Sequence, residues 1–339
     1  MATEKKSALK ENKGVSHSEI TNSASIKNIK KKRNAKINPK TLVASILKKD
    51  ITALSRAITL VESKNAEHLD FANSIIKQCL PHANNSIRIG ITGVPGVGKS
   101  TFIETFGKHL TALGKRVAVL AIDPSSSLTK GSILGDKTRM EELVKDENAY
   151  IRPSASGKSL GGVARKTRES IILCEAAGFD VIIIETVGVG QSETTVHSMV
   201  DFFLLLKLAG AGDELQGIKR GIIEMADAIA INKADGDNLK RAKLAKVEFN
   251  RALHLYPQKS SNWQPKVTLC SAIQNEGISD IWNIILEYIE TTTQNNYFNI
   301  KRNEQNKFWL IQTIEEQLKS DFFNRPDIKK ELATQLHLI

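Results

Sequence analysis

The chain has 339 residues, of which 41% are hydrophobic, and it carries a formal net charge of +11. This length and apolar content suffice for a packed core in one large or two modest domains, so a wholly disordered protein is excluded. No apolar run approaches the roughly 18 residues that a membrane-spanning helix needs, and the three cysteines lie too far apart for a zinc site or a disulfide framework.

The basic charge is concentrated at the N-terminus. Residues 1–40 hold eleven Lys and Arg against three Glu and few apolar residues, so we expect a disordered basic tail. The run Lys30–Arg33 fits a solvated extension, which we favour, or a contact with RNA, an acidic lipid surface or an acidic partner. We expect no specific nucleic-acid partner and no membrane span. The tail lacks the apolar core of a secretory signal, and it has one arginine where mitochondrial transit peptides favour several, so we expect a cytoplasmic protein.

Apolar residues recur at helical spacing from about Thr41. They predict two or three helices that end near Leu80, with Asp50 as an N-cap, and we assign 41–82 to an N-terminal helical extension.

Short apolar runs then alternate with helix-length segments through the interval 83–292. The runs lie at 87–92, 117–122, 181–185, 202–208, 228–232 and 267–270. Strands separated by helices predict an α/β fold with a mostly parallel, doubly wound sheet that is covered on both faces.

Beyond Gly277 the pattern is helical again. One helix is expected over about 278–291, and the next carries an apolar face made of Phe308, Ile311, Ile314, Leu318 and Phe322. The pattern leaves open whether the segment 293–339 folds back on its own domain or forms a dimerisation arm.

The strongest motif is a complete GxxxxGKS that follows an apolar run and precedes a helical pattern. Its glycines let the loop wrap so that backbone N–H groups point at phosphate oxygens, and the following helix adds its positive N-terminal end. Lys99 is expected to reach the β- and γ-phosphates, and the Ser100 hydroxyl to ligate Mg²⁺. The predicted nucleotide-binding residues here are Gly93, Val94, Pro95, Gly96, Val97, Gly98, Lys99, Ser100 and Thr101.

The sequence NKAD at 232–235 predicts which base is bound. A carboxylate can accept two hydrogen bonds from guanine N1–H and the 2-amino group, and adenine offers no such pair of donors. Asp235 is therefore the expected guanine selector, Asn232 belongs to the same motif, and the stem of Lys233 is expected to lie across the base. Ser271 and Ala272, after the next apolar run, fit the loop that closes over the base. The expected ligand is GTP or GDP.

Carboxylates between these motifs are candidates for the metal and hydrolysis elements. Glu185 ends a buried strand, Asp123 ends another, and Asp136 lies in a polar loop, so each is either a member of the Mg²⁺ shell with Ser100 or an exposed loop carboxylate. Gln191 is placed either to orient the attacking water or as a surface residue. With Lys99, these four residues make up the predicted catalytic set.

Five further segments are similar to the MeaB/ArgK-type GTPases, a family that includes methylmalonic aciduria type A-like proteins. The resemblance covers about residues 41–320, and the segments are 123–127, 131–140, 160–164, 185–193 and 211–219.

The resemblance implies a dimer-forming P-loop GTPase with helical extensions at both ends, of which 293–339 is a dimerisation arm. It implies that Asp123, Asp136 and Glu185 belong to the Mg²⁺ and switch shell, and that 211–219 is a third switch. It also implies a chaperone that binds an adenosylcobalamin-dependent acyl-CoA mutase, methylmalonyl-CoA mutase, and gates cofactor loading or protection.

Three other functions remain open. A related family label assigns such proteins to basic amino-acid transport as an ATPase or kinase, which NKAD disfavours. A metal-insertion GTPase is disfavoured because the histidines are scattered. The third is an adaptor that acts through the basic tail. No arginine finger is obvious, although Arg139, Arg165 and Arg168 are candidates.

Overall fold

A computed structural model describes residues 38–63, 65–122, 140–153, 160–186, 192–209 and 220–336. All but one of these residues belong to one compact unit, Pro39–Ile339, and the description below concerns that unit. The basic tail predicted over 1–40 lies almost wholly outside the described residues.

The centre of the unit is a seven-stranded sheet with the order β3-β2-β4-β1-β5-β6-β7. Every neighbouring pair of strands is parallel. The strands are β1 Ile87–Gly93, β2 Val117–Ile122, β3 Ala149–Pro153, β4 Val181–Thr186, β5 Phe202–Leu208, β6 Ala228–Asn232 and β7 Lys266–Leu269. The predicted parallel, doubly wound α/β fold is confirmed, with one edge strand, β3, that the apolar runs did not indicate.

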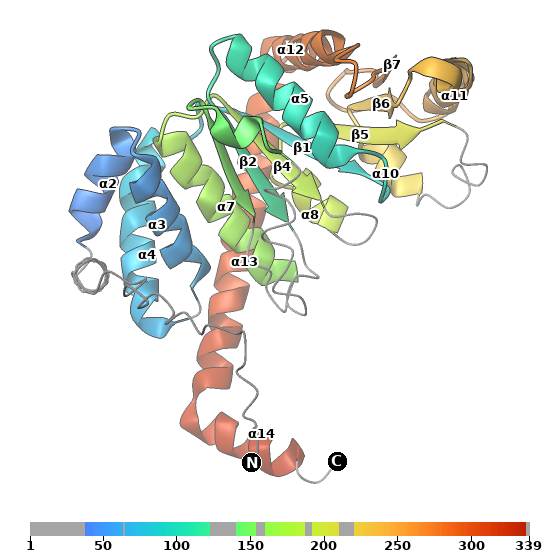
Figure 1. The fold of residues 1–339 in the computed structure, drawn as a ribbon. Coiled ribbons are helices and arrows are strands. Elements are labelled where there is room, and N and C mark those ends of the chain that lie inside the picture. The colour runs from blue at the N-terminus through green and yellow to red at the C-terminus, as the bar shows by residue number, and fades with distance from the viewer. Residues whose placement is uncertain are drawn as a thin grey trace, which may run out of the picture. The chain divides into compact units, whose positions relative to one another are not determined.

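Helices cover both faces of this sheet (Figure 1). One face packs against α5 and α12, and the other against α7, α8, α10 and α11. The helices α2, α3 and α4 lie outside α7. The bounds are α2 Pro39–Leu47, α3 Ile51–Glu62, α4 Ala66–Cys79, α5 Lys99–Ala112, α7 Leu160–Ala176, α8 Ser192–His197, α10 Arg220–Met225, α11 Leu239–Leu253, α12 Ile278–Gln294, α13 Tyr297–Asn324 and α14 Pro326–Leu336, with short 3₁₀ turns at Leu80–His82, Leu143–Lys145 and Gly236–Asn238.

The continuous apolar runs follow from this two-sided burial. Ile182 and Ile184 of β4 belong to the core cluster on the α7 face, and Ile183 belongs to the cluster on the α5 face. Since successive side chains of a strand point to opposite faces, a strand that is covered on both sides is apolar at most of its positions. Asp50 caps α3 as predicted, because its carboxylate accepts hydrogen bonds from the amides of Thr52 and Ala53.

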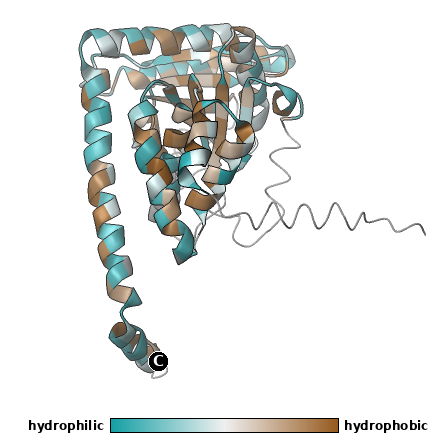
Figure 2. Ribbon diagram, turned by 90° about the vertical axis from the view of Figure 1, so that its left-hand side faces the viewer, coloured by the Kyte–Doolittle hydropathy of each residue, from teal (hydrophilic) through white to brown (hydrophobic). Residues whose placement is uncertain are grey.

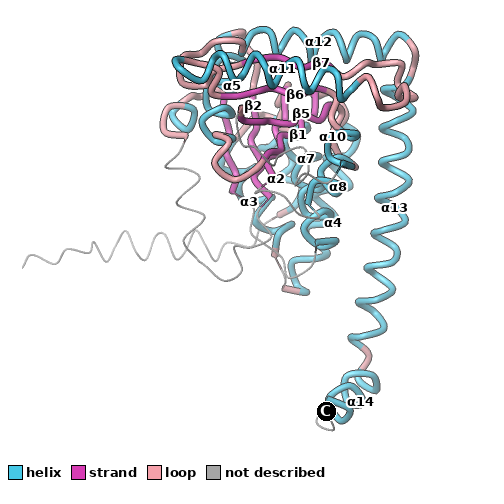
Figure 3. The backbone as a smooth tube through the Cα atoms, turned by 90° about the vertical axis from the view of Figure 1, so that its right-hand side faces the viewer, coloured by secondary structure: helices cyan, strands magenta, loops and turns pink. Residues whose placement is uncertain are grey.

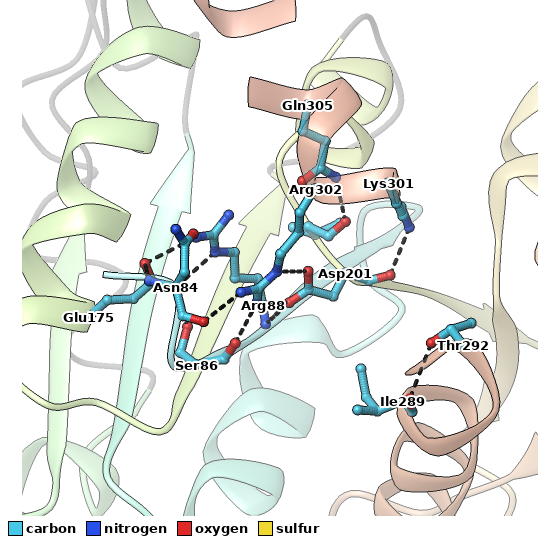
Figure 4. A network of polar contacts seen from close by, with 11 residues as sticks. Asn84, Ser86, Arg88, Glu175, Asp201, Ile289, Thr292, Lys301, Arg302 and Gln305 are labelled. Atoms are coloured by element: carbon cyan, nitrogen blue, oxygen red, sulfur yellow. Dashed lines mark hydrogen bonds and ion pairs between the residues drawn. The ribbon is translucent and has the colours of Figure 1, made fainter. Parts of the chain in front are cut away.

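A buried ionic network fastens the first turns of α13 to the sheet (Figure 4). The Arg302 guanidinium donates to both carboxylate oxygens of Asp201 at 2.8 and 2.7 Å, and to the carbonyls of Asn84 and Ser86 at 2.8 and 2.6 Å. Burial alone would raise the pKa of Asp201, but the hydrogen bonds and the charge of Arg302 outweigh burial and hold that pKa below its usual value. Asp201 is therefore ionised in the folded chain, and the attachment of α13 is electrostatic.

The rest of α13 extends away from the sheet, with α14 at its far end (Figures 1 and 3). Apolar side chains along both helices remain accessible, and the ribbon in Figure 2 alternates between hydrophobic brown and hydrophilic teal segments along this arm. The more exposed of these are Phe308, Leu310, Ile311, Ile314, Leu318, Phe322, Phe323, Leu332 and Leu336. This exposed face includes all five residues whose spacing predicted it.

None of the helices in the described part of the chain combines the length and the apolar character that crossing a membrane requires.

Replacing Arg302 tests the electrostatic attachment of α13. Arg302→Ala leaves the Asp201 carboxylate buried without its counterion, so the free energy of unfolding is expected to fall by about 3–5 kcal/mol, as measured by urea denaturation. Arg325→Ala is the matched control, because Arg325 pairs with Asp327 on the surface of the same arm and its loss is expected to change little. Equal losses in the two variants would contradict this account.

Candidate functional site

The candidate site begins where β1 ends and α5 starts. The connecting loop bends at two glycines in the left-handed region, Gly96 at φ +81° and Gly98 at φ +94°, and Gly98 caps α5. The side chain of Val97 between them is fully buried and anchors the loop to the core. The sequence therefore forms the predicted strand–loop–helix in which a glycine-rich loop leads into a helix N-terminus, the arrangement that binds phosphate groups.

Lys99 lies folded over this loop. Its Nζ donates to the carbonyl of Gly93 at 2.8 Å and to that of Val94 at 3.3 Å, and the side chain is almost wholly buried. Burial lowers the pKa of the Lys99 ammonium, while the carboxylates of Glu185 and Glu193 act in the opposite direction. The ammonium therefore already sits at the phosphate loop, held by neutral carbonyls that a phosphate can replace.

Two oxygen ligands suited to Mg²⁺ meet beside the loop. The Ser100 hydroxyl lies 3.4 Å from Oε1 of Glu185 and donates to it. A hydroxyl and a carboxylate are hard donors of the kind that Mg²⁺ takes alongside water and substrate phosphates, so the residues present fit this ion. Asp123, Asp136 and Gln191, the other predicted members of the metal and catalytic set, lie outside the described residues. Within the described ranges, no three His, Cys, Asp or Glu side chains cluster as a metal site.

The side chain of Asn232 connects three loops. Its Nδ2 donates to the Val97 carbonyl of the phosphate loop at 2.9 Å, and its Oδ1 accepts from the Ala272 amide at 3.2 Å and from the Cys270 thiol at 3.6 Å. Asn232 ends β6, while Cys270 and Ala272 follow β7. The amide thus joins the phosphate loop to the two loops expected to hold the base.

Asp235 and Lys233 lie beside this junction. Ser271 donates to Oδ2 of Asp235 at 2.5 Å, which leaves the other carboxylate oxygen for further hydrogen bonds. The Nζ of Lys233 donates to the Gly96 carbonyl at 3.0 Å, so its stem runs from the NKAD turn back to the phosphate loop. The predicted residues Asn232, Lys233, Asp235, Ser271 and Ala272 are therefore gathered at one edge of the sheet.

Sequence reasoning missed several supporting side chains. Thr186 at the end of β4 donates to Thr92 of β1 at 2.8 Å, and so ties together the two strands that carry Glu185 and the phosphate loop. Thr105 of α5 donates to the Ala272 carbonyl at 2.8 Å. In the sequence, Thr92 and Thr186 are visible only as threonines at or beside the ends of two apolar runs. Their pairing could not be predicted, because a contact between distant residues leaves no local pattern.

Two of the three arginine-finger candidates are already bound elsewhere. Arg165 pairs with Glu169 at 2.9 Å, and Arg168 donates to the carbonyls of Ser198 and Gln305. Arg139 lies outside the described residues.

Comparison with known proteins decides the family. The family model described as methylmalonyl-CoA mutase-associated GTPase MeaB matches residues 54–327. The chain belongs to this MeaB family.

Relatives of this MeaB-family chain carry several names. It is 52% identical over 279 residues to a putative GTPase of Caulobacter vibrioides, covering 82% of this chain and 85% of the relative. It is 46% identical over 297 residues to the GTPase ArgK of Escherichia coli, covering 87% and 90%. It is 45% identical over 301 residues to the mitochondrial methylmalonic aciduria type A homolog of Mus musculus, covering 86% and 72%. A solved structure described as a LAO/AO transport system kinase aligns with a TM-score of 0.73 at 38% identity, over 88% of this chain and 92% of that one.

Adding a methyl group at Gly98 tests the junction at Asn232. Both Gly98 and Gly114 have positive φ, but a Cβ at Gly98 would lie 2.9 Å from Nδ2 of Asn232, whereas a Cβ at Gly114 meets nothing within 4 Å. Both Ala variants are expected to lose about 1–2 kcal/mol of stability through backbone strain. Gly98→Ala is also expected to weaken nucleotide binding at least about tenfold in calorimetric titration, while Gly114→Ala binds normally. Normal binding by Gly98→Ala would contradict the account.

Proposed function

We propose that this MeaB-family protein is a GTP-hydrolysing switch that binds an adenosylcobalamin-dependent acyl-CoA mutase, methylmalonyl-CoA mutase, and gates the loading or protection of its cofactor. The proposal that the protein binds GTP rests on the Asp235 carboxylate, which accepts a hydrogen bond from Ser271 and lies beside the phosphate loop. The proposal that a mutase is its partner is supported by the family description and by the name of the mouse relative.

Guanine selection follows from the hydrogen-bond acceptors that the Asp235 carboxylate offers to the base. Oδ2 of Asp235 accepts from Ser271, so the carboxylate keeps capacity to accept from the N1–H and the 2-amino group of guanine. Adenine presents an unprotonated N1 and no 2-amino group to the same carboxylate. A site built to pair with donors rejects a ligand that lacks them, because its own polar groups would be left unpaired.

Hydrolysis rests on positioning and on neutralising charge. The Lys99 ammonium leaves the carbonyls of Gly93 and Val94 for the β- and γ-phosphates, and the loop amides with the N-terminus of α5 bind phosphate oxygens. Ser100 and Glu185, with Asp123 and Asp136, are the proposed holders of Mg²⁺, which when bound neutralises charge on the phosphates. Gln191 is the proposed residue that orients the attacking water. Among the described candidates, Arg165 and Arg168 are engaged elsewhere, so the proposal is that turnover is slow until a partner stimulates it.

The arm is the proposed dimerisation surface. Exposed apolar residues recur along α13 and α14, and exposed apolar surface of this kind marks protein–protein contact. The switch output requires that the mutase bind the GTP and GDP states with different affinity, since equal affinities shift no equilibrium. All three cysteines are free and buried, which fits a reducing compartment, and the cytoplasm is the proposed location.

A role in the transport of lysine, arginine or ornithine as an ATPase or kinase is the alternative function. It is favoured by the description of the aligned solved structure as a LAO/AO transport system kinase and by the name of the Escherichia coli relative. The proposed role of Asp235 as guanine selector counts against ATP, because adenine offers no pair of donors to a carboxylate.

Exchanging the selector for its amide tests the base assignment. Asp235→Asn keeps the size of the side chain but replaces an acceptor with a donor, so GTP affinity is expected to fall at least about a hundredfold, and xanthosine triphosphate, which offers a 2-oxo acceptor, to bind better than GTP. Asp237→Asn in the adjacent turn is the control that keeps GTP affinity. A GTP affinity unchanged in Asp235→Asn would contradict the assignment.

Turnover of GTP and of ATP by the purified chain with Mg²⁺ tests the partner. GTP hydrolysis is expected to be slow alone and to rise about tenfold or more when an adenosylcobalamin-dependent acyl-CoA mutase is added. Lys99→Ala with the same mutase is the control for contaminating activity. If the mutase leaves GTP hydrolysis unchanged, the proposed partner is contradicted but the GTPase activity is not. A preference for ATP would favour the transport alternative.

A further inference from the structure

A cavity of about 330 Å³ lies between α7, the segment that follows α4, and residues 305–310 of α13. Its apolar wall includes Ile171, Ile172 and Met199, and its polar wall includes Arg168 and Trp309. The wall residues include none of the nucleotide-site residues named above, so this is a separate feature of the fold. Its volume is at the lower end of the range typical of small-molecule pockets.

The charge of Arg168 is the unusual feature of this wall. The residue is 8% exposed, and its guanidinium donates only to neutral acceptors: the Gln305 carbonyl at 3.0 Å, and the carbonyl and hydroxyl of Ser198 at 2.8 and 3.1 Å. No Asp or Glu oxygen in the described part of the chain lies within ion-pair distance of it. Burial, and to a lesser degree the charge of Arg88, lowers the pKa of Arg168 to about 10, so it remains protonated at neutral pH.

Arg88 is the second arginine that lines the cavity, and unlike Arg168 it has a carboxylate as its counterion. Its Nε and one terminal nitrogen donate to the two oxygens of Glu175 at 2.9 and 3.0 Å (Figure 4). The Arg88–Glu175 pair is therefore neutral as a unit. One uncompensated positive charge, that of Arg168, remains on the wall.

Buried charges in proteins are as a rule paired, because an ion removed from water without a counterion is strongly disfavoured. Two lining residues also carry a buried N–H with no acceptor among the described residues, Nε of Arg168 on α7 and Nε1 of Trp309 on α13. A positive charge without a counterion beside an apolar surface suits an anion that carries an apolar body.

We infer that this cavity binds a small organic carboxylate, with the carboxylate group beside Arg168 and the hydrocarbon part against Ile171, Ile172 and Met199. The inference is independent of the proposed function, since it uses no residue of the nucleotide site. Because Arg168 also holds the backbone of α13 through Gln305, a ligand here sits at the root of the arm and stabilises its attachment.

Fluorescence of Trp309 in the full-length protein provides a direct test. The chain is titrated with straight-chain monocarboxylates from formate to hexanoate as sodium salts, with sodium chloride at equal ionic strength as the blank. The expected result is a saturable change in emission and an affinity that rises about fourfold with each added methylene, as burial of one methylene predicts. Trp309→Phe identifies the reporter: the signal should disappear while calorimetry still detects binding.

Two variants separate charge from volume. Arg168→Met keeps the length of the side chain and removes its charge, so carboxylate binding is expected to be lost. Ala83→Leu keeps Arg168 and fills part of the cavity, so hexanoate is expected to lose more affinity than acetate does. Arg251→Met, which removes an exposed guanidinium from α11, is the matched control and should bind as the unaltered chain does.

Three results would overturn the inference. The first is the absence of a saturable response to any of the carboxylates in the unaltered chain. The second is binding that persists in Arg168→Met or is insensitive to Ala83→Leu. The third is equal affinity for formate and hexanoate, which would show a surface ion effect without an apolar pocket. Circular dichroism of each variant confirms that the fold is retained.

Discussion

One buried amide, the side chain of Asn232, connects the loops of the proposed nucleotide site. Its nitrogen is bonded to the phosphate loop at Val97, and its oxygen to the loop after β7 at Ala272. Because both polar atoms of the amide are hydrogen-bonded, they fix the phosphate loop, the NKAD turn and the loop that carries Ser271 relative to one another. A site arranged in this way before its ligand arrives loses less conformational entropy on binding. The absence of a side chain at Gly98 is part of the same constraint, since a Cβ there would meet the Asn232 amide.

The strand β1 connects this site with the arm. Its last residue, Gly93, begins the phosphate loop, and near its first residue the backbone amide of Arg88 donates to Asp201 at 2.8 Å. Asp201 in turn binds Arg302 of α13. The nucleotide site and the root of the arm are therefore attached to opposite ends of one central, fully hydrogen-bonded strand. In the proposed switch, this strand is the rigid element common to the nucleotide and to the surface that pairs with a second copy.

The sequence predicted what depends on local pattern. Six of the seven strands coincide with mainly apolar runs because they are covered on both faces, and the phosphate loop and NKAD are short motifs whose residues are adjacent in the chain. β3 was missed because Ala149–Pro153 is a short edge strand that contains Arg152 and ends in proline. The pair of Asp201 and Arg302 was also missed, because two residues about a hundred positions apart leave no periodic signal. Arg168 was a finger candidate by type alone, and only its contacts with Ser198 and Gln305 show that it is engaged elsewhere. Asp123, Asp136 and Gln191 stay predictions.

The central claim is that the loops tied together by Asn232 form a guanine site before any nucleotide binds. Equilibrium binding of GDP and of ADP to the purified chain with Mg²⁺, measured by calorimetry under identical conditions, tests it most directly. The account predicts that GDP binds at least about a hundredfold more tightly, because only guanine offers two donors to Asp235. Equal affinity for GDP and ADP would contradict it.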